Sequence, residues 1–170
     1  MNSVTKELAK EAKKNGICTE WYYQLRTLED KEKLIEMYLK GIDFCLLHDY
    51  PSNDFIRVNF KGIMEKYGVH IDEEININNE RKVVALGKCS GIVKVDQYTI
   101  SEVFLKHDSE LNISAEGQSF IMIDMFDNTK LRVDTYDNAK VCINRYGGEI
   151  EFHSLGNSVV KVKEKNKKTH

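Results

Sequence analysis

Two acidic residues in the second half of the chain could carry acid–base chemistry. A polar side chain follows an apolar pair about every ten residues, and this outer polar series is Ser114, Asp124, Asp134, Asn144 and His153. Polysaccharide-cleaving β-helix enzymes use acidic residues on such a surface, where two carboxylates share the acid and base roles. Asp124 and Asp134 are therefore candidates for a carbohydrate site, with Asn144 as a binding residue. We favour the simpler interpretation that these side chains bond backbone groups where strands end.

An aromatic series accompanies the polar one. Phe126, Tyr136 and Tyr146 each stand one residue before a turn pair. Stacked rings could bind sugar rings or the apolar edge of a partner protein, because an aromatic face with a hydroxyl suits a half-wet surface. Packing of the rings at the corners of the fold is the simpler interpretation.

Metal and cofactor chemistry has little support in this sequence. Cys45 and His48 have a ligand-like spacing, with Cys18 upstream, but structural zinc usually needs four ligands and no clear fourth is present. No Walker loop, Rossmann fingerprint, GxSxG elbow or HExxH pair occurs. We therefore expect no metal, no cofactor and no enzymatic activity.

Five lysines lie within the last ten residues of the chain, KVKEKNKKTH. Such a run can contact nucleic acid or an acidic partner. More often it is a solvated tail, and a stack of strands needs a polar end that blocks edge-to-edge growth. We therefore expect a basic tail over residues 163–170 and no nucleic-acid partner.

A repeat of apolar pairs organises the stretch in which these residues stand. Successive pairs begin 8 to 10 residues apart, and they are Val83/Ala85, Val93/Val95, Val103/Leu105, Leu111/Ile113, Ile121/Ile123, Leu131/Val133, Val141/Ile143, Ile150/Phe152 and Val160/Val162. Gly, Asn and Asp, which tolerate positive φ, separate the units. Alternation at period two makes each unit a short, half-buried strand.

Two arrangements of these strands are open. In an antiparallel meander with two-residue hairpins, neighbouring units would present their apolar pairs to opposite faces, and only bulged turns would correct this. Parallel coils of two units need no correction, because they stack Leu111 beneath Leu131 and Ile121 beneath Val141. We predict an α+β chain with a β-solenoid of roughly ten-residue units. The alternative is an antiparallel meander or a β-sandwich.

Helical patterns occupy the part of the chain before the repeat. Residues 3–14 are helix formers stopped by Asn15-Gly16, and a short helix follows Thr19. Thr27 and Asp30 resemble a capping box for a third helix that ends at Gly41, and Ser52 could cap another. The apolar segment 42–47 is helix or strand. We expect a helical docking domain over residues 1–71, a linker or the start of the first coil over 72–82, and repeats over 83–162.

Composition narrows the remaining possibilities. The 170 residues carry a formal net charge of -2, which gives no basic field for nucleic acid. The four cysteines are far apart and suggest reduced thiols. No signal peptide or long apolar run is present. We therefore expect a soluble, cytoplasmic protein, or one assembled into a phage particle, without a membrane partner.

The segments NGICTEWYYQL and LIEMYLKGIDFCLLHDYPSNDFIRVNF resemble uncharacterised proteins of Bacteroidota and of their phages and mobile elements, and YDNAKV resembles the short units of bacterial β-helix proteins. The resemblance implies a helical part followed by β-helix-like repeats, and no known activity. Together with the repeat, it favours a non-enzymatic assembly or protein-interaction module, and the resemblance suggests an association with phages or mobile elements. The alternative is a carbohydrate-binding or carbohydrate-active protein that uses the outer face of the repeats.

Overall fold

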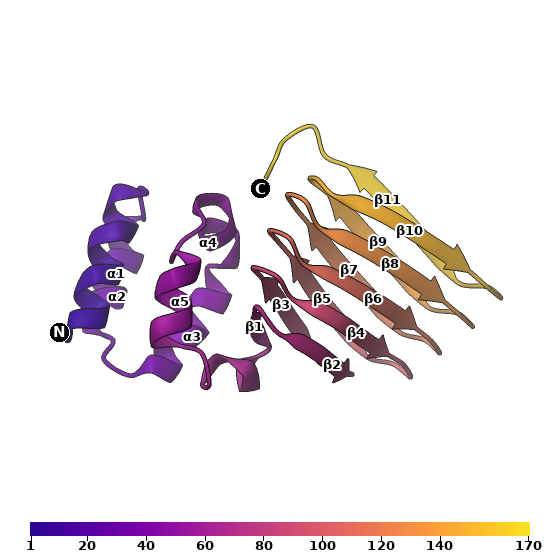
Figure 1. Ribbon diagram of the computed structural model, residues 1–170, viewed down its shortest axis with the longest axis horizontal. Helices are drawn as coiled ribbons and strands as arrows, with labels where there is room; N and C mark the ends of the chain where they lie inside the picture. The colour runs from indigo at the N-terminus through magenta and orange to yellow at the C-terminus, as the bar shows by residue number, and fades with distance from the viewer. The chain divides into compact units, whose positions relative to one another are not determined.

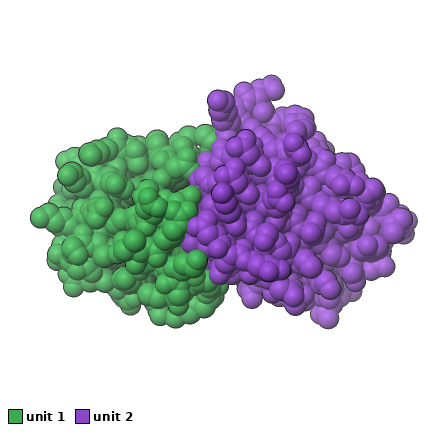
Figure 2. Space-filling model, viewed as in Figure 1, with its two compact units in different colours: residues 1–67, 169–170 green, residues 68–168 purple.

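The computed structural model describes residues 1–170 and divides them into two compact units. Figure 2 shows them in two colours: a helical unit of residues 1–67 with 169–170, and a unit of residues 68–168 built from strands. None of the helices has the length and apolar content needed to cross a membrane.

The helical unit contains short helices that bury apolar stripes. They are α1 (Ser3–Lys14), α2 (Thr19–Thr27), α3 (Lys31–Lys40), α4 (Ile42–His48), α5 (Asn53–Asn59) and the 3₁₀ turn η1 (Met64–Tyr67). In α1 the apolar residues Leu8 and Ala12 are buried, and the Asn2 side chain caps the helix by accepting from the Thr5 N–H. The ambiguous apolar segment is the helix α4.

One predicted cap is wrong. The N-cap of α3 is Asp30, whose carboxylate accepts from the Glu32 N–H at 2.8 Å. Thr27 instead donates its hydroxyl to the Gln24 carbonyl at 2.7 Å, inside α2. Asp30 is short enough to cap the helix itself, so it is the cap and not the third residue of a capping box. Ser52 caps α5 as predicted, accepting from the Phe55 N–H at 3.2 Å.

The second unit is a β-solenoid, as the repeat predicts, and not a meander (Figure 1). Its strands are β1 (Val69–Ile71), β2 (Glu74–Asn78), β3 (Lys82–Leu86), β4 (Ser90–Val95), β5 (Ile100–Leu105), β6 (Glu110–Ala115), β7 (Phe120–Met125), β8 (Lys130–Thr135), β9 (Lys140–Arg145), β10 (Glu149–Ser154) and β11 (Val159–Glu164). The odd-numbered strands form sheet A and the even-numbered strands form sheet B, and all pairs within each sheet are parallel.

Each coil of the solenoid contains one strand of each sheet. Leu111 pairs with Leu131 in sheet B, and Ile121 pairs with Val141 in sheet A, so the predicted register is confirmed. The apolar pairs form one continuous core between the sheets, in which Val133 is fully buried. Small residues fit the corners where the chain turns, and the buried members are Cys89, Ser109, Ser119, Thr129 and Ala139.

The boundary between the units lies earlier than predicted, between Tyr67 and Gly68. The strand β1 belongs to sheet A, and residues 72–82, expected as a linker or the start of the first coil, contain β2, which pairs with β4 in sheet B. Residues 72–82 are therefore the start of the first coil. Ile75 and Ile77 are buried there, although the polar residues around them hid the strand in the sequence.

Candidate functional site

The structure separates the two candidate carboxylates, Asp124 and Asp134. Asp124 lies in β7 of sheet A and Asp134 in β8 of sheet B, so they belong to opposite outer faces of the solenoid. Asp124 accepts a hydrogen bond from the Asn144 side-chain amide at 2.7 Å, and Asp134 lies 3.4 Å from the Arg132 guanidinium. Two carboxylates on opposite faces cannot flank one glycosidic bond, so Asp124 and Asp134 do not form the acid–base pair for which they were candidates.

The aromatic series is divided in the same way. Phe126 and Tyr146 stack at one edge of the solenoid, with ring centroids 4.7 Å apart, whereas Tyr136 lies at the other edge, 36% exposed. Lys106 Nζ lies over the Phe126 ring, 5.2 Å from its centroid. Because Phe126 is fully buried, it supports corner packing and offers no face to a sugar.

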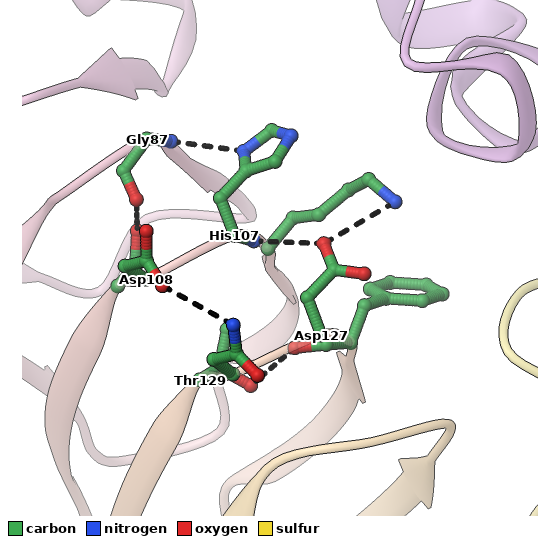
Figure 3. A network of polar contacts seen from close by, with 9 residues as sticks. Gly87, His107, Asp108, Asp127 and Thr129 are labelled. Atoms are coloured by element: carbon green, nitrogen blue, oxygen red, sulfur yellow. Dashed lines mark hydrogen bonds and ion pairs between the residues drawn. The ribbon is translucent and has the colours of Figure 1, made fainter.

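A polar network at this edge links the turns of successive coils (Figure 3). The Gly87 N–H donates to His107 Nδ1 at 3.0 Å, and the His107 N–H donates to the Asp127 carboxylate at 3.1 Å. The Thr129 hydroxyl donates to the Phe126 carbonyl at 2.7 Å. The His107 and Asp127 side chains hold backbone groups of adjacent coils and so stack the turns, whereas Thr129 bonds a carbonyl of its own turn.

The cysteine and histidine spacing does not form a metal site. Cys45 is buried in α4 while His48 is exposed, and no group of three or more potential ligands gathers anywhere in the chain. Burial raises the pKa of the Cys45 thiol to about 12, so this thiol is protonated at neutral pH. A protonated thiol is a poor metal ligand and a poor nucleophile.

The helical unit holds an apolar pocket of about 300 Å³. Its walls include Trp21, Tyr38, Phe44 and Cys45. Burial raises the pKa of Tyr38 well above its usual value. The Tyr50 hydroxyl, at the same pocket, donates to the Leu8 carbonyl at 2.8 Å. The sequence gave no sign of this opening.

A more polar groove of about 340 Å³ lies over the start of the strands of sheet B. Lys130 lies 3.2 Å from Glu110, and Arg132 lies 3.8 Å from Glu151. Asn112 also lines the groove, and no aromatic ring does. The groove can therefore offer hydrogen bonds and charges but no stacking platform.

The last coil differs from all earlier ones. We call β10, the turn 155–158 and β11 the terminal coil; β10 and β11 end their sheets in Figure 1. Phe152 pairs with Val133 and faces the core side, yet it is 42% exposed where Val133 is 0% exposed. At the other end of sheet B, Ile75 and Ile77 are only 5% and 9% exposed.

The two strands of the terminal coil carry opposite charges on their outer faces. Glu149 and Glu151 lie in β10, in register with the outward Lys130 and Arg132 of β8. Lys161 and Lys163 lie in β11. The repeat predicted a strand at Val160/Val162, but β11 continues to Glu164, so Lys163 lies in the strand and the expected basic tail 163–170 begins too early.

Comparisons with protein families, with curated proteins and with solved structures find no match for this chain. The resemblance to proteins of Bacteroidota and their phages stays a prediction. The terminal coil stands out because it leaves the core-side residue Phe152 exposed.

Proposed function

We propose that this chain is a non-enzymatic self-assembly module that associates through its terminal coil. One observation carries the proposal. The position of Phe152 is occupied in earlier coils of sheet B by Val93, Ile113 and Val133, which are at most 2% exposed, whereas Phe152 is 42% exposed. The terminal coil thus presents a core side chain that no further coil covers.

Backbone chemistry supports the same surface. β10 and β11 each have a neighbouring strand on one side only, so each presents a row of N–H and C=O groups along its other edge. Such an edge accepts an added strand, with main-chain hydrogen bonds giving affinity and alternate side chains giving specificity. Covering the exposed part of Phe152 contributes roughly 1 kcal/mol for each copy.

Light scattering coupled to size-exclusion chromatography tests this proposal. We expect the wild-type mass to rise from that of a monomer toward that of a dimer as the concentration increases. Phe152→Lys should remain monomeric, because it places a charge at the centre of the added contact. Tyr98→Lys is the matched control, since Tyr98 is an aromatic residue 83% exposed in a turn away from the terminal coil.

Two results would contradict the proposal. A wild-type protein that is monomeric at every concentration would remove self-assembly. Equal association of the Phe152 and Tyr98 variants would remove the terminal coil as the surface. Circular dichroism of both variants establishes that each keeps the wild-type content of strand.

We place this assembly inside a cell or in a phage particle, as the resemblance suggests. Mass spectrometry of purified particles from a host carrying the gene is the direct check. Peptides from residues 83–162 should be recovered with the particle, and their recovery only in the particle-free lysate would oppose a phage role.

A second candidate is carbohydrate binding in the groove over sheet B. The observation behind it is the gathering of the Arg132 guanidinium, the Asn112 amide and the Glu110 and Glu151 carboxylates along one groove. We expect a glycan array to give hits that Arg132→Ala abolishes. An array without hits would eliminate this candidate, and it would leave the assembly proposal untouched.

A further inference from the structure

We propose that the assembly is a closed, two-fold symmetric dimer in which β10 of each copy pairs antiparallel with β11 of the other. The two terminal coils meet directly, so the interface uses the same surface on both copies. This inference rests on the proposed function, and it specifies the partner as a second copy of this chain.

The two ends of the solenoid exclude an open head-to-tail stack. Such a stack would require a bare coil at the first end of the solenoid to receive the terminal coil of the next copy. At that end Ile71, Ile75 and Ile77 are already buried, at 0%, 5% and 9% exposed. Only the terminal coil presents core side chains, so contact of like ends is favoured, and a two-fold contact of like ends closes at two copies.

Two orientations of the two-fold axis could bring the terminal coils together. The strands of sheets A and B run in opposite directions, as the arrows in Figure 1 show. An axis running across the sheets places β11 against β11 and β10 against β10. An axis running along the strands places β10 against β11 of the partner, and the strand pairs are antiparallel in both cases.

Charge selects the axis along the strands. In the other orientation the lysines of β11, Lys161 and Lys163, would face the same lysines of the partner molecule. The glutamates of β10, Glu149 and Glu151, would likewise face the partner's glutamates. Like charges directly opposite each other in a sheet are destabilising, and opposite charges are stabilising. Pairing β10 with β11 therefore replaces two repulsive contacts by two attractive ones.

One register satisfies both faces of the paired strands. Its opposed pairs are Glu149 with Lys163, Ile150 with Val162, Glu151 with Lys161 and Phe152 with Val160. The apolar members face the core side in the existing sheets, next to Leu131, Val133, Val141 and Ile143. The apolar core thus continues from one copy into the other.

The small area of the contact determines how strongly the dimer depends on protein concentration. A strand of six residues is about 20 Å long and the sheets are about 10 Å apart, so the end of the coil is small. It falls below the standard interface of roughly 800 Å² on each partner. We therefore expect a dimer that depends on concentration, and that weakens with added salt because the four charges are exposed.

Charge reversal tests the pairing. One variant carries Glu149→Lys and Glu151→Lys, and the other carries Lys161→Glu and Lys163→Glu. Each variant alone should be monomeric, because both of its strand pairs would bring like charges together. An equimolar mixture should recover the wild-type dimer, because each strand pair then joins opposite charges.

The outcomes separate this inference from the proposed function. A wild-type protein without any dimer defeats the proposed function before a variant is made. If both variants still form the dimer when each is alone, the pairing of β10 with β11 is wrong. With the other axis, each variant opposes like charges just as the wild type does, so its dimer would be kept. A mixture that stays monomeric overturns it as well.

Crosslinking tests the register directly. In a Cys18→Ser and Cys142→Ser background, a protein carrying Glu149→Cys is mixed with one carrying Lys163→Cys. Directly opposed residues have Cβ atoms about 5 Å apart, so a short bismaleimide should join one copy of each. Efficient crosslinking of the Lys163→Cys protein with itself alone would instead identify the other axis and overturn the proposal.

Discussion

The carboxylate of Asp127 accepts a hydrogen bond, at 3.1 Å, from the backbone N–H of His107, twenty residues earlier in the chain. The same carboxylate lies 3.5 Å from the ammonium group of Lys106, whose side chain is only 5% exposed. Asp137 repeats the backbone contact at the other edge of the solenoid, accepting from the Gly117 N–H at 2.9 Å. Turn carboxylates thus connect adjacent coils along both edges.

The two turn carboxylates should differ in their contribution to stability. Asp127→Ala should lower the free energy of unfolding by about 2 to 3 kcal/mol, because it removes an acceptor and leaves the buried Lys106 ammonium without this carboxylate. Asp137→Ala should cost about 1 to 2 kcal/mol, since only the backbone contact is lost. Both residues have positive φ, so the backbone strain of alanine cancels in the comparison. Urea unfolding measures both, and equal losses would show that the Lys106 pair contributes nothing.

The core of the solenoid should reject a charge. Val133→Asp should unfold the repeat, because Val133 is 0% exposed and burying an unpaired carboxylate costs several kcal/mol. Asn112→Asp places the same group on the exposed face of the adjacent strand β6 and should change the midpoint little. Thermal melting followed by circular dichroism compares them, and equal melting temperatures would refute the inward assignment.

A close backbone approach should make Gly91 irreplaceable. Gly91 has φ of +136°, and a Cβ atom there would lie 2.0 Å from the Ile75 carbonyl oxygen in the paired strand β2. Gly91→Ala should therefore cost more than 2 kcal/mol, as strain and a lost strand pair combine. Gly156→Ala also places alanine at positive φ, but its nearest contact is 3.2 Å. Chemical unfolding should show a clearly larger loss for Gly91→Ala, and similar losses would disprove the steric role.

Burial should control the reactivity of the thiols. Cys18 is exposed, whereas Cys45 is buried and its pKa is raised to about 12. With Ellman's reagent at pH 8 we expect fast modification of Cys18 and modification of Cys45 only on unfolding. Mass spectrometry identifies the labelled site. Early labelling of Cys45 in a protein with native circular dichroism would contradict the buried placement.

The same pKa shift predicts a loss of stability in alkali. The ordinary thiol pKa is 9.0, so between about pH 9 and 12 the unfolded chain releases the Cys45 proton while the folded chain keeps it. The contribution of Cys45 to stability is therefore present below pH 9 and is lost as the pH rises toward 12. Cys45→Ala should remove this component, so its unfolding free energy should fall less steeply than that of the wild type over this range.

The sequence alone determined which side chains face the core. Leu131, Val133, Val141 and Ile143 were predicted as inward residues, and all are at most 3% exposed. This succeeds because the direction of a side chain in a strand depends only on the parity of its position, which is a local property. The positions of the turns could be predicted for a similar reason, because Gly, Asn and Asp at fixed positions adopt the backbone angles that the turns require.

The pairing of distant residues was decided by the tertiary structure. Asp124 and Asp134 stand at equivalent places in a ten-residue repeat, but the coil takes two repeats and assigns alternate repeats to opposite sheets. The helix and strand boundaries near residue 70 depended on pairing as well, because β2 is a strand through its partner β4 and not through its polar composition. Side chains that look adjacent in the repeat are therefore separated by the whole core.

The exposure of side chains in the last coil could not be predicted from the sequence either. Phe152 and Val133 occupy the same position in the repeat, and their patterns of flanking residues predict the same burial. Only the stacking of coils leaves Phe152 42% exposed and Val133 fully buried, because β8 lies between two strands of its sheet whereas no further coil covers β10. The sequence thus determined the repeating unit and its inner face, and the three-dimensional stack decided which unit remains uncovered.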